Sequence, residues 1–382
     1  LGGTTGGRID FNVMSTGSYS GSAIIGTETL PFTGKLWVNT PNDTSANGAF
    51  LLKPKHAPAA IYLPFTISDD GDTDPLTATI AVSQQFFAWR NKWLPPEAID
   101  PFKGYYTFAF SVPAGANVPK GNGFGSVIID ASGKTVVTGR VADGETFNTT
   151  SHLSPEGKVI IYQTLYTTTA KGSLLAILDI DPGVGSAPSF FANTSIALWQ
   201  RPADDRSTAR TYKSGFGPVD MGVFGGFYTP PIAGTGAGSI IMSLPAAAGS
   251  PLKNALLSFA TTLGTDPLPV NADVSLEIKP GGTTKVNTPN PKLVTFSVTP
   301  TDGRFKGSYT TKDNDPRPPL SATPRPQISR KVDYQGIILT DDGTPYGYGF
   351  FLRDALPKAD GSTTPTTSPK DSGDLLLRNS NL

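Results

Sequence analysis

The sequence predicts an all-β protein of two antiparallel, meander-type β-barrels or sandwiches, and three observations support this. A hairpin phrase rich in glycine and aromatic residues occurs three times. The chain has 42 glycines and 35 prolines among 382 residues, and only 16% of its residues are charged. Short runs that alternate in polarity recur between turn residues. Glycine, proline, serine and threonine disfavour helices, whereas alternating runs with aromatic and β-branched residues favour strands.

The repeated phrase has two halves. The first half joins an aromatic residue to a glycine and a serine, and it stands at 17–22, 123–126 and 303–308. The second half is a large residue, a spacer, a glycine and an alternating run, and it stands at 32–36, 137–141 and 334–338. The spacing between the halves fits two short strands and a turn. In the third copy a proline-rich segment extends the predicted hairpin tip, where insertions are tolerated.

The glycines of the phrase are predicted to be points where the sheet bends. A glycine inside a strand costs stability, and it usually marks a bend, a bulge or the close approach of another backbone. Strongly curved sheets need such points, and neighbouring aromatic rings cover the gap that a glycine leaves. We therefore expect two β domains built from repeated Gly-aromatic-Gly hairpins.

Composition shifts divide the chain into two domains and a tail. Pro230 and Pro231 precede a run of glycines and small residues, which is typical of a linker. The predicted order is a first β domain at 1–230, a linker at 231–237, a second β domain at 238–357 and an extended C-terminal arm with a short terminal strand at 358–382. Pro95 and Pro96 indicate a sub-boundary near 94–103.

Two stretches are candidates for helices. Residues 85–93 read as helical or irregular, and residues 251–263 carry an apolar set that includes Leu252, Leu256 and Phe259.

Charge and cysteine content exclude several classes of protein. Lysine plus arginine equals aspartate plus glutamate, at 31 each, so no net field attracts nucleic acid. The absence of cysteine excludes disulfide frameworks and thiol catalysis. No apolar run approaches the roughly 18 residues of a transmembrane helix. The chain begins at Leu1, so we expect a processed chain or a piece of a longer one, and a removed signal peptide would fit.

Asp70, Asp72 and Asp74 form the best candidate metal site. They stand at alternate positions in an Asp- and Gly-rich segment, which is how oxygen ligands are spaced in calcium loops. The downstream glutamate of an EF-hand is missing. The segment therefore predicts either a Ca²⁺ site or a solvated hairpin tip.

No residue pattern predicts catalysis. His56 and His152 are far apart, no G-x-S-x-G elbow is present, and glutamates are scarce. We predict that the chain is not an enzyme. Tyr346 and Tyr348 alternate with Phe350 on one strand face, and they are predicted either to form a glycan-stacking platform or to pack in a core.

One stretch resembles a family. The order of Tyr105-Tyr106-Thr107, Gly121–Val127, Gly139–Gly144, Leu165-Tyr166, Lys171–Leu175 and Leu198-Trp199 is similar to a Gly-rich β-repeat. That repeat occurs near the C-termini of large secreted or surface proteins of environmental bacteria. The resemblance covers roughly 9–382 and implies export and an extracellular or cell-surface location, with no activity to assign. Such repeats often open with a further strand, so the first barrel is expected to lack one.

These observations predict a secreted structural protein that assembles with copies of itself. Leu375, Leu376 and Leu377 form an apolar run at the end of the predicted arm, suited to closing its own barrel or to pairing with a neighbour. An incomplete first sheet is a template for a strand from another copy. The expected product is a filament or surface layer formed by strand exchange or edge pairing. The alternative is a carbohydrate-binding or adhesin module whose partner is a surface polysaccharide.

Overall fold

The computed structural model confirms the all-β prediction. It describes residues 6–26, 28–40, 45–55, 59–68, 76–80, 84–89, 96–115, 117–166, 172–183, 190–204, 209–230, 255–260, 273–279, 282–319, 323–341 and 344–379. Within these ranges the only helix is a 3₁₀ segment, η2 (Pro96–Phe102). All strand pairs between the named strands are antiparallel, as the meander pattern predicts.

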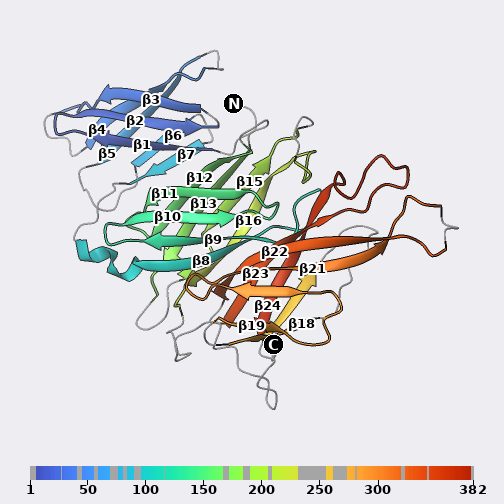
Figure 1. Ribbon diagram of the computed structural model, residues 1–382. Coiled ribbons are helices and arrows are strands. Elements are labelled where there is room, and N and C mark those ends of the chain that lie inside the picture. The colour runs from blue at the N-terminus through green and yellow to red at the C-terminus, as the bar shows by residue number, and fades with distance from the viewer. Residues whose placement is uncertain are drawn as a thin grey trace.

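The described strands form three bodies in chain order (Figure 1). The first, here called the N-terminal unit, contains a three-stranded sheet and two hairpins. Its strands are β1 (Gly7–Val13), β2 (Ser18–Ile25), β3 (Glu28–Lys35), β4 (Ser45–Leu52), β5 (Ile61–Ser68), β6 (Leu76–Ile80) and β7 (Gln84–Ala88). The β1–β2–β3 sheet and the β4–β5 hairpin share a small core, in which the rings of Phe32 and Phe50 lie 4.6 Å apart.

The second body, barrel 1, is a nearly closed meander. Its strands are β8 (Gly104–Ser111), β9 (Asn122–Ile129), β10 (Lys134–Arg140), β11 (Thr146–His152), β12 (Lys158–Leu165), β13 (Gly172–Asp181), β14 (Phe190–Phe191), β15 (Ile196–Arg201) and β16 (Phe216–Phe227). The last strand, β16, pairs with the first, β8, which closes the sheet. Among the described residues β11 and β12 form no ladder, so the barrel has one seam, between these two strands.

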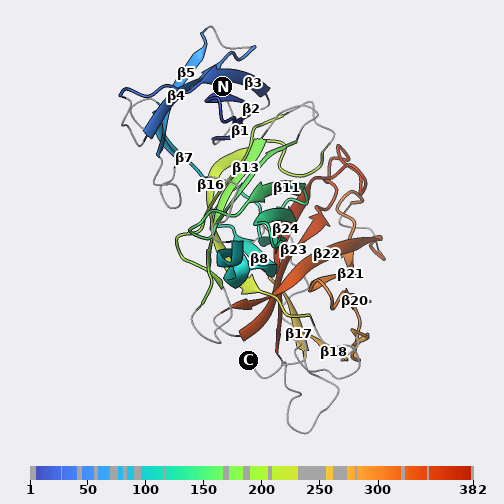
Figure 2. The ribbon, with the colours of Figure 1, turned by 90° about the vertical axis from the view of Figure 1, so that its left-hand side faces the viewer.

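The third body, barrel 2, closes in the same way. Its strands are β17 (Ala255–Ala260), β18 (Val274–Ile278), β19 (Thr284–Val286), β20 (Thr295–Val298), β21 (Arg304–Asn314), β22 (Gln327–Asp341), β23 (Thr344–Asp354) and β24 (Lys370–Asn379). The last strand, β24, pairs with both β23 and the first strand, β17. Figure 2 shows the three bodies following one another from the N-terminal unit to barrel 2.

Each copy of the repeated phrase is one hairpin. The three copies are β2–β3, β9–β10 and β21–β22. The third hairpin is longest, and its ladder runs out to the Asn314–Gln327 pair before the proline-rich tip. The predicted hairpin unit and its inserted tip are therefore confirmed.

The glycines of these hairpins lie directly across from aromatic residues. Gly125 faces Phe108 and Gly139 faces Phe147 on neighbouring strands. A methyl group in place of the hydrogen would lie 2.5 Å from Cζ of Phe108 at Gly125, and 2.3 Å from Cζ of Phe147 at Gly139. The same arrangement, glycine first, recurs at Gly34/Tyr19, Gly48/Phe65, Gly307/Tyr334, Gly336/Phe305 and Gly373/Phe351. The ring fills the space that a side chain would take, as the sequence predicts.

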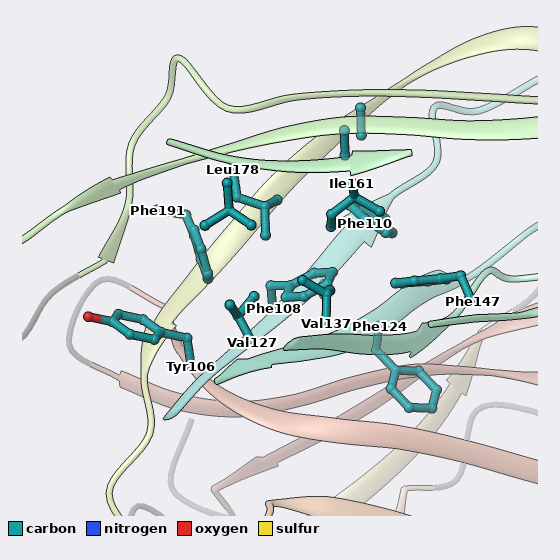
Figure 3. Packing of buried hydrophobic residues seen from close by; sticks show 14 of the residues in the cluster. Tyr106, Phe108, Phe110, Phe124, Val127, Val137, Phe147, Ile161, Leu178 and Phe191 are labelled. Carbon is teal, nitrogen blue, oxygen red and sulfur yellow. The ribbon is translucent and has the colours of Figure 1, made fainter. Parts of the chain in front are cut away.

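The interior of barrel 1 is filled by alternate side chains of its strands. On β8 the rings of Tyr106, Phe108 and Phe110 are fully buried, and Figure 3 shows Phe110 beside Ile161 and Tyr106 beside Phe191. Burying one such aromatic side chain stabilises the fold by about 1.5–3 kcal/mol. The intervening residues of β8 are also buried, because barrel 2 covers the outer face of this strand.

Three local predictions need correction. Residues 85–93 overlap strand β7, and residues 251–263 contain strand β17, which pairs with β18 and β24. Partner strands override the weak helical preference of both stretches. The predicted terminal strand is present as β24, but it is an inner strand of barrel 2 and not the end of a free arm, and its apolar side chains complete that core. The predicted linker at 231–237 lies outside the described residues, and η2 lies within the predicted sub-boundary at 94–103.

Substituting Gly125 by Val tests the glycine–aromatic pairing. The side chain would meet Phe108 and, at 2.8 Å, the backbone oxygen of Thr138, which cannot move aside without breaking the sheet. We expect a loss of about 3 kcal/mol in the free energy of unfolding, the upper end for an overpacked core. Urea denaturation followed by tryptophan fluorescence measures it. Gly115→Ala, at an exposed position near only the Val118 side chain, is the control; equal losses in both variants would contradict the pairing.

Candidate functional site

Barrels 1 and 2 are joined by a continuous apolar contact. Ile337, Leu339 and Phe350 belong to barrel 2 by sequence, yet they are buried within the core cluster of barrel 1. Phe350 lies beside Phe124, with ring centroids 6.0 Å apart. Domains that share a core in this way move as one body. The two barrels therefore form a single rigid block.

Hydrogen bonds between side chains fix how the two barrels fit together. Arg304 on β21 donates to the hydroxyls of Thr138 (2.7 Å) and Ser126 (3.2 Å) on barrel 1. Asn122 on β9 donates to the Asp374 carboxylate on β24 at 2.7 Å. Burial raises the pKa of Asp374, although the hydrogen bonds from the Leu375 amide and from Asn122 oppose the rise.

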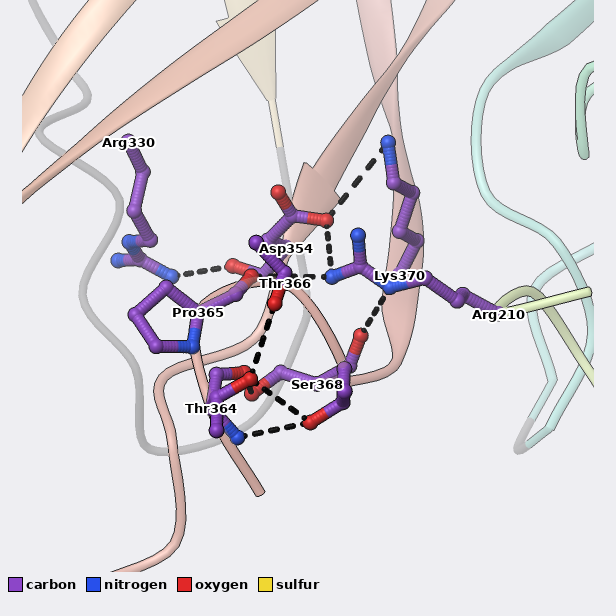
Figure 4. Close-up of polar contacts among 9 residues, drawn as sticks. Arg210, Arg330, Asp354, Thr364, Pro365, Thr366, Ser368 and Lys370 are labelled. Atoms are coloured by element: carbon purple, nitrogen blue, oxygen red, sulfur yellow. Dashed lines mark hydrogen bonds and ion pairs between the residues drawn. The ribbon is translucent and has the colours of Figure 1, made fainter.

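A second set of polar contacts joins the end of barrel 1 to the loop before β24 (Figure 4). The Arg210 guanidinium donates to the carbonyl of Ser368 at 2.7 Å and forms an ion pair with Asp354 at 2.7 Å. The backbone amide of Lys370 donates to the Arg210 carbonyl at 2.8 Å, and its ammonium lies 3.7 Å from Asp354. This clamp of Arg210, Asp354, Ser368 and Lys370 holds the start of β24 against barrel 1.

The most buried polar cluster lies within barrel 1. The Asp143 carboxylate accepts from the Tyr166 hydroxyl at 2.7 Å and from Arg201 at 2.9 Å. Tyr166 in turn accepts from the Trp199 indole at 3.0 Å. The Arg201 guanidinium also lies 4.4 Å from the centre of the Tyr166 ring and donates to the Thr211 hydroxyl. Each ionised group thus has a partner of opposite charge and several hydrogen bonds.

The protonation states follow from this burial. Desolvation raises the pKa of Asp143, against the lowering effect of Tyr166 and Arg201. Desolvation and the neighbouring Asp143 raise the pKa of Tyr166 well above its usual value, so this hydroxyl stays protonated and acts as a donor. Because the cluster is closed to solvent, its role is to fix the turn at Asp143 against β15.

Asp143, Tyr166 and Trp199 belong to separate motifs of the repeat that the sequence resembles. The structure brings all three side chains together. It does so because each stands at or beside the end of a strand at the same end of barrel 1. Sequence reasoning missed Arg201 and Thr211. A signal was present: an aspartate buried in an apolar turn requires a cation, and Arg201 follows Trp199 by two residues.

The residues predicted for assembly lie in the wall of barrel 2. Leu375 and Leu377 point into the core of barrel 2, with 0% and 2% of their surface exposed, and Leu376 is half-buried on the other face. Both edges of β24 are occupied by β23 and β17. The run therefore closes its own barrel, which was one of the two predicted roles, and it offers no free edge in this state.

The structure describes the residues of the predicted glycan platform but not those of the predicted metal site. Tyr346 and Tyr348 lie side by side with ring centroids 5.9 Å apart, but Tyr348 packs edge-on against Phe224 of barrel 1 at 4.7 Å. Their face is half-buried between the barrels, which corresponds to the packing alternative for Tyr348. The predicted ligands Asp70, Asp72 and Asp74 lie outside the described residues.

In the described ranges, no three histidine or acidic side chains come close enough together to hold a metal ion. Over the same ranges, no helix has the length and apolar character to cross a membrane.

Comparison with known proteins returned no relative. No protein-family model matches the chain, and searches of curated proteins and of solved structures found no match. The bacterial surface family suggested by the motifs stays a prediction.

Substituting Arg201 by Met tests the buried cluster. It leaves the Asp143 carboxylate without its cation, and breaking a buried pair in this way costs about 3–5 kcal/mol of folding free energy. Urea unfolding monitored by tryptophan fluorescence measures the loss. The control, Asp143→Leu with Arg201→Met, removes both charges and is expected to lose less. A single variant as stable as the original protein would show that the pair is not stabilising.

The contact between the barrels predicts a pH dependence. An acid whose pKa is raised on folding binds more protons in the folded state than in the unfolded state. The free energy of unfolding therefore increases as pH falls through the folded pKa toward the unfolded value. Asp374→Asn keeps the bond from Asn122 and removes the charge. We expect the variant to melt at a higher temperature than the original protein at pH 8. The difference should shrink toward about pH 4, near the unfolded pKa of aspartate; a difference constant with pH would contradict the assignment.

Proposed function

We propose that this chain is an exported structural protein of a bacterial surface that assembles with copies of itself through edge pairing. The observation that carries the proposal is the open sheet of the N-terminal unit. Among the described residues, β1 pairs with β2 alone and β7 pairs with β6 alone. In each of the two barrels that follow, the first and last strands pair with each other, and the described residues leave one seam, β11/β12 in barrel 1 and β19/β20 in barrel 2. In its described part the N-terminal unit has seven strands in three separate sheets, whereas barrel 1 has nine strands and barrel 2 has eight, each barrel in one continuous sheet.

The direction of its backbone groups allows β1 to pair with a further strand on the side away from β2. The amide of Met14, just after β1, donates to the Ser18 carbonyl on β2 at 2.8 Å. Since backbone groups alternate in direction along a strand, those of Val13, Phe11 and Ile9 point away from β2. An exposed row of this kind is a template for a strand of another chain.

The rigidity of the remaining chain supports a structural role. Barrels 1 and 2 share a core and two sets of polar contacts, so force applied to one barrel is transmitted to the other. The buried Asp143 cluster stabilises a turn, and we propose no enzymatic activity for it. Export and surface location rest on the resemblance of the repeat motifs alone.

We do not propose β24 as the connector. Moving it to a neighbour would take Leu375 and Leu377 out of the core of barrel 2. Exposing two leucines costs about 3–6 kcal/mol, and the sheet would lose both flanking ladders.

Substituting Val13 by Pro tests edge pairing. Proline removes the amide that points away from β2, and the exposed side chain of Val13 contributes no core packing. We expect loss of assembly, measured as average mass by light scattering and as filaments or layers by electron microscopy. Val13→Ala, which keeps the amide, is the matched control and should assemble normally. Assembly of the proline variant, or a monomeric original protein at high concentration, would contradict the proposal.

One exposed aromatic residue supports a second candidate function. Trp37 has 47% of its surface exposed beside Val38, at the end of the N-terminal unit, and sugars stack on exposed rings of this kind. The chain would then be an adhesin or carbohydrate-binding module. Glycan-array binding that is lost in Trp37→Ala and retained in Tyr62→Ala, at another exposed aromatic, is the expected result. Equal loss in both variants, or no binding at all, removes this candidate.

A further inference from the structure

The seam of barrel 1 exposes the backbone edge of β11. The amide of Leu153 donates to Gly133 next to β10, so the groups of His152 and Thr150 point the other way, into the seam. An unpaired edge in a barrel wall is the same liability as an unpaired edge in an open sheet.

Side chains of the N-terminal unit satisfy this edge. The Trp89 indole donates to the carbonyl of His152 at 3.0 Å, and Arg8 donates to the carbonyl of Thr150. On the β12 side of the seam, the Thr164 hydroxyl donates to the carbonyl of Gly26 at 2.8 Å. The unit therefore straddles the seam, with contacts on β11 and on β12.

This contact differs in kind from the one between the barrels. The core of the N-terminal unit contains only residues of that unit, and the core of barrel 1 contains none of them. Among the described residues, the contacts of the unit with β11 and β12 are polar bonds, and the core of the unit does not extend into the seam. Exchange of such a unit between identical copies is a low-cost route to assembly, because the same bonds form between molecules.

We propose that the seam of barrel 1 is an intermolecular docking surface whose occupant is the N-terminal unit of a second copy. Each copy carries one such unit and one seam in barrel 1, so docking between molecules runs head to tail and extends. The inference rests on the proposed self-assembly and names its second interface. A tethered unit has an effective concentration on the order of 1 mM, so exchange is favoured where copies are already brought together, as by pairing through β1.

Cysteine cross-linking tests the proposal directly, because the chain has no native cysteine. The pair Gly26→Cys and Thr164→Cys spans the seam contact, and a short bismaleimide joins it wherever the unit is docked. We expect a ladder of intermolecular products on denaturing gels whose share rises with protein concentration. The control pair, Asn122→Cys and Asp374→Cys, spans the fused contact between the barrels and should give only an intramolecular product.

The outcomes separate this inference from the proposed function. Only intramolecular product at the seam pair, while light scattering shows oligomers, overturns the docking inference and leaves edge pairing intact. Absence of oligomers in the original protein overturns the proposed function; the seam pair at high concentration then decides the docking inference by presence or absence of the ladder.

A second variant keeps the test valid if Gly26, with a φ of +62°, does not tolerate cysteine. Arg8→Ala with Trp89→Phe removes both donors to β11, and neither residue belongs to the core of the unit. We expect the average mass of the assembly to fall at a fixed concentration. Lys35→Ala with Tyr62→Phe, at exposed positions of the same unit, is the control. An unchanged mass in the first variant overturns the inference.

Discussion

The fold depends on one packing constraint: an aromatic ring on one strand occupies the space above a glycine on the next. The constraint acts in both directions. Without the ring, the glycine leaves a gap and a flexible backbone; without the glycine, the ring has no place inside a narrow barrel. Pairs such as Gly125/Phe108 and Gly139/Phe147 fix which residues face each other, and thereby the register of β8 against β9 and of β10 against β11. Register in turn decides which face of every strand is buried.

The same constraint explains why the sequence predicts the fold better than it predicts the contacts. In the first and third copies the repeated phrase contains both the glycine and its ring, as in Gly34/Tyr19 and Gly307/Tyr334, so the hairpins β2–β3 and β21–β22 can be recognised from the sequence alone. In the β9–β10 copy the rings come from the neighbouring strands β8 and β11. The pairing of β24 with β17 joins residues more than a hundred positions apart, and no local pattern records it. Leu375 and Leu377 look identical whether they close their own barrel or a neighbour's, because period-2 patterning specifies a buried face and not a partner.

The polar sites were predictable only in part, for a related reason. Asp143, Tyr166 and Trp199 stand out as motif residues, yet the sequence gives no distance between them. Their meeting depends on barrel 1 bringing the ends of three strands together. Arg201 completes the cluster because a buried carboxylate needs a cation, a requirement of desolvation that composition does not display. The aspartates at 70, 72 and 74 show the converse: a clear local pattern whose setting stays outside the described residues.

The position of β24 also has a consequence for the order in which this protein is made. A strand that lies between β23 and β17 is needed before either neighbour has both of its ladders. Barrel 2 therefore cannot close until residue 379 has left the ribosome or crossed a membrane, while barrel 1 has all its strands by residue 227. Since domains generally fold as units during synthesis, barrel 1 is expected to form first. The outer face of its β8 and β9, which carries Phe124 and Ser126, is then still uncovered and serves as the surface on which the later barrel is built.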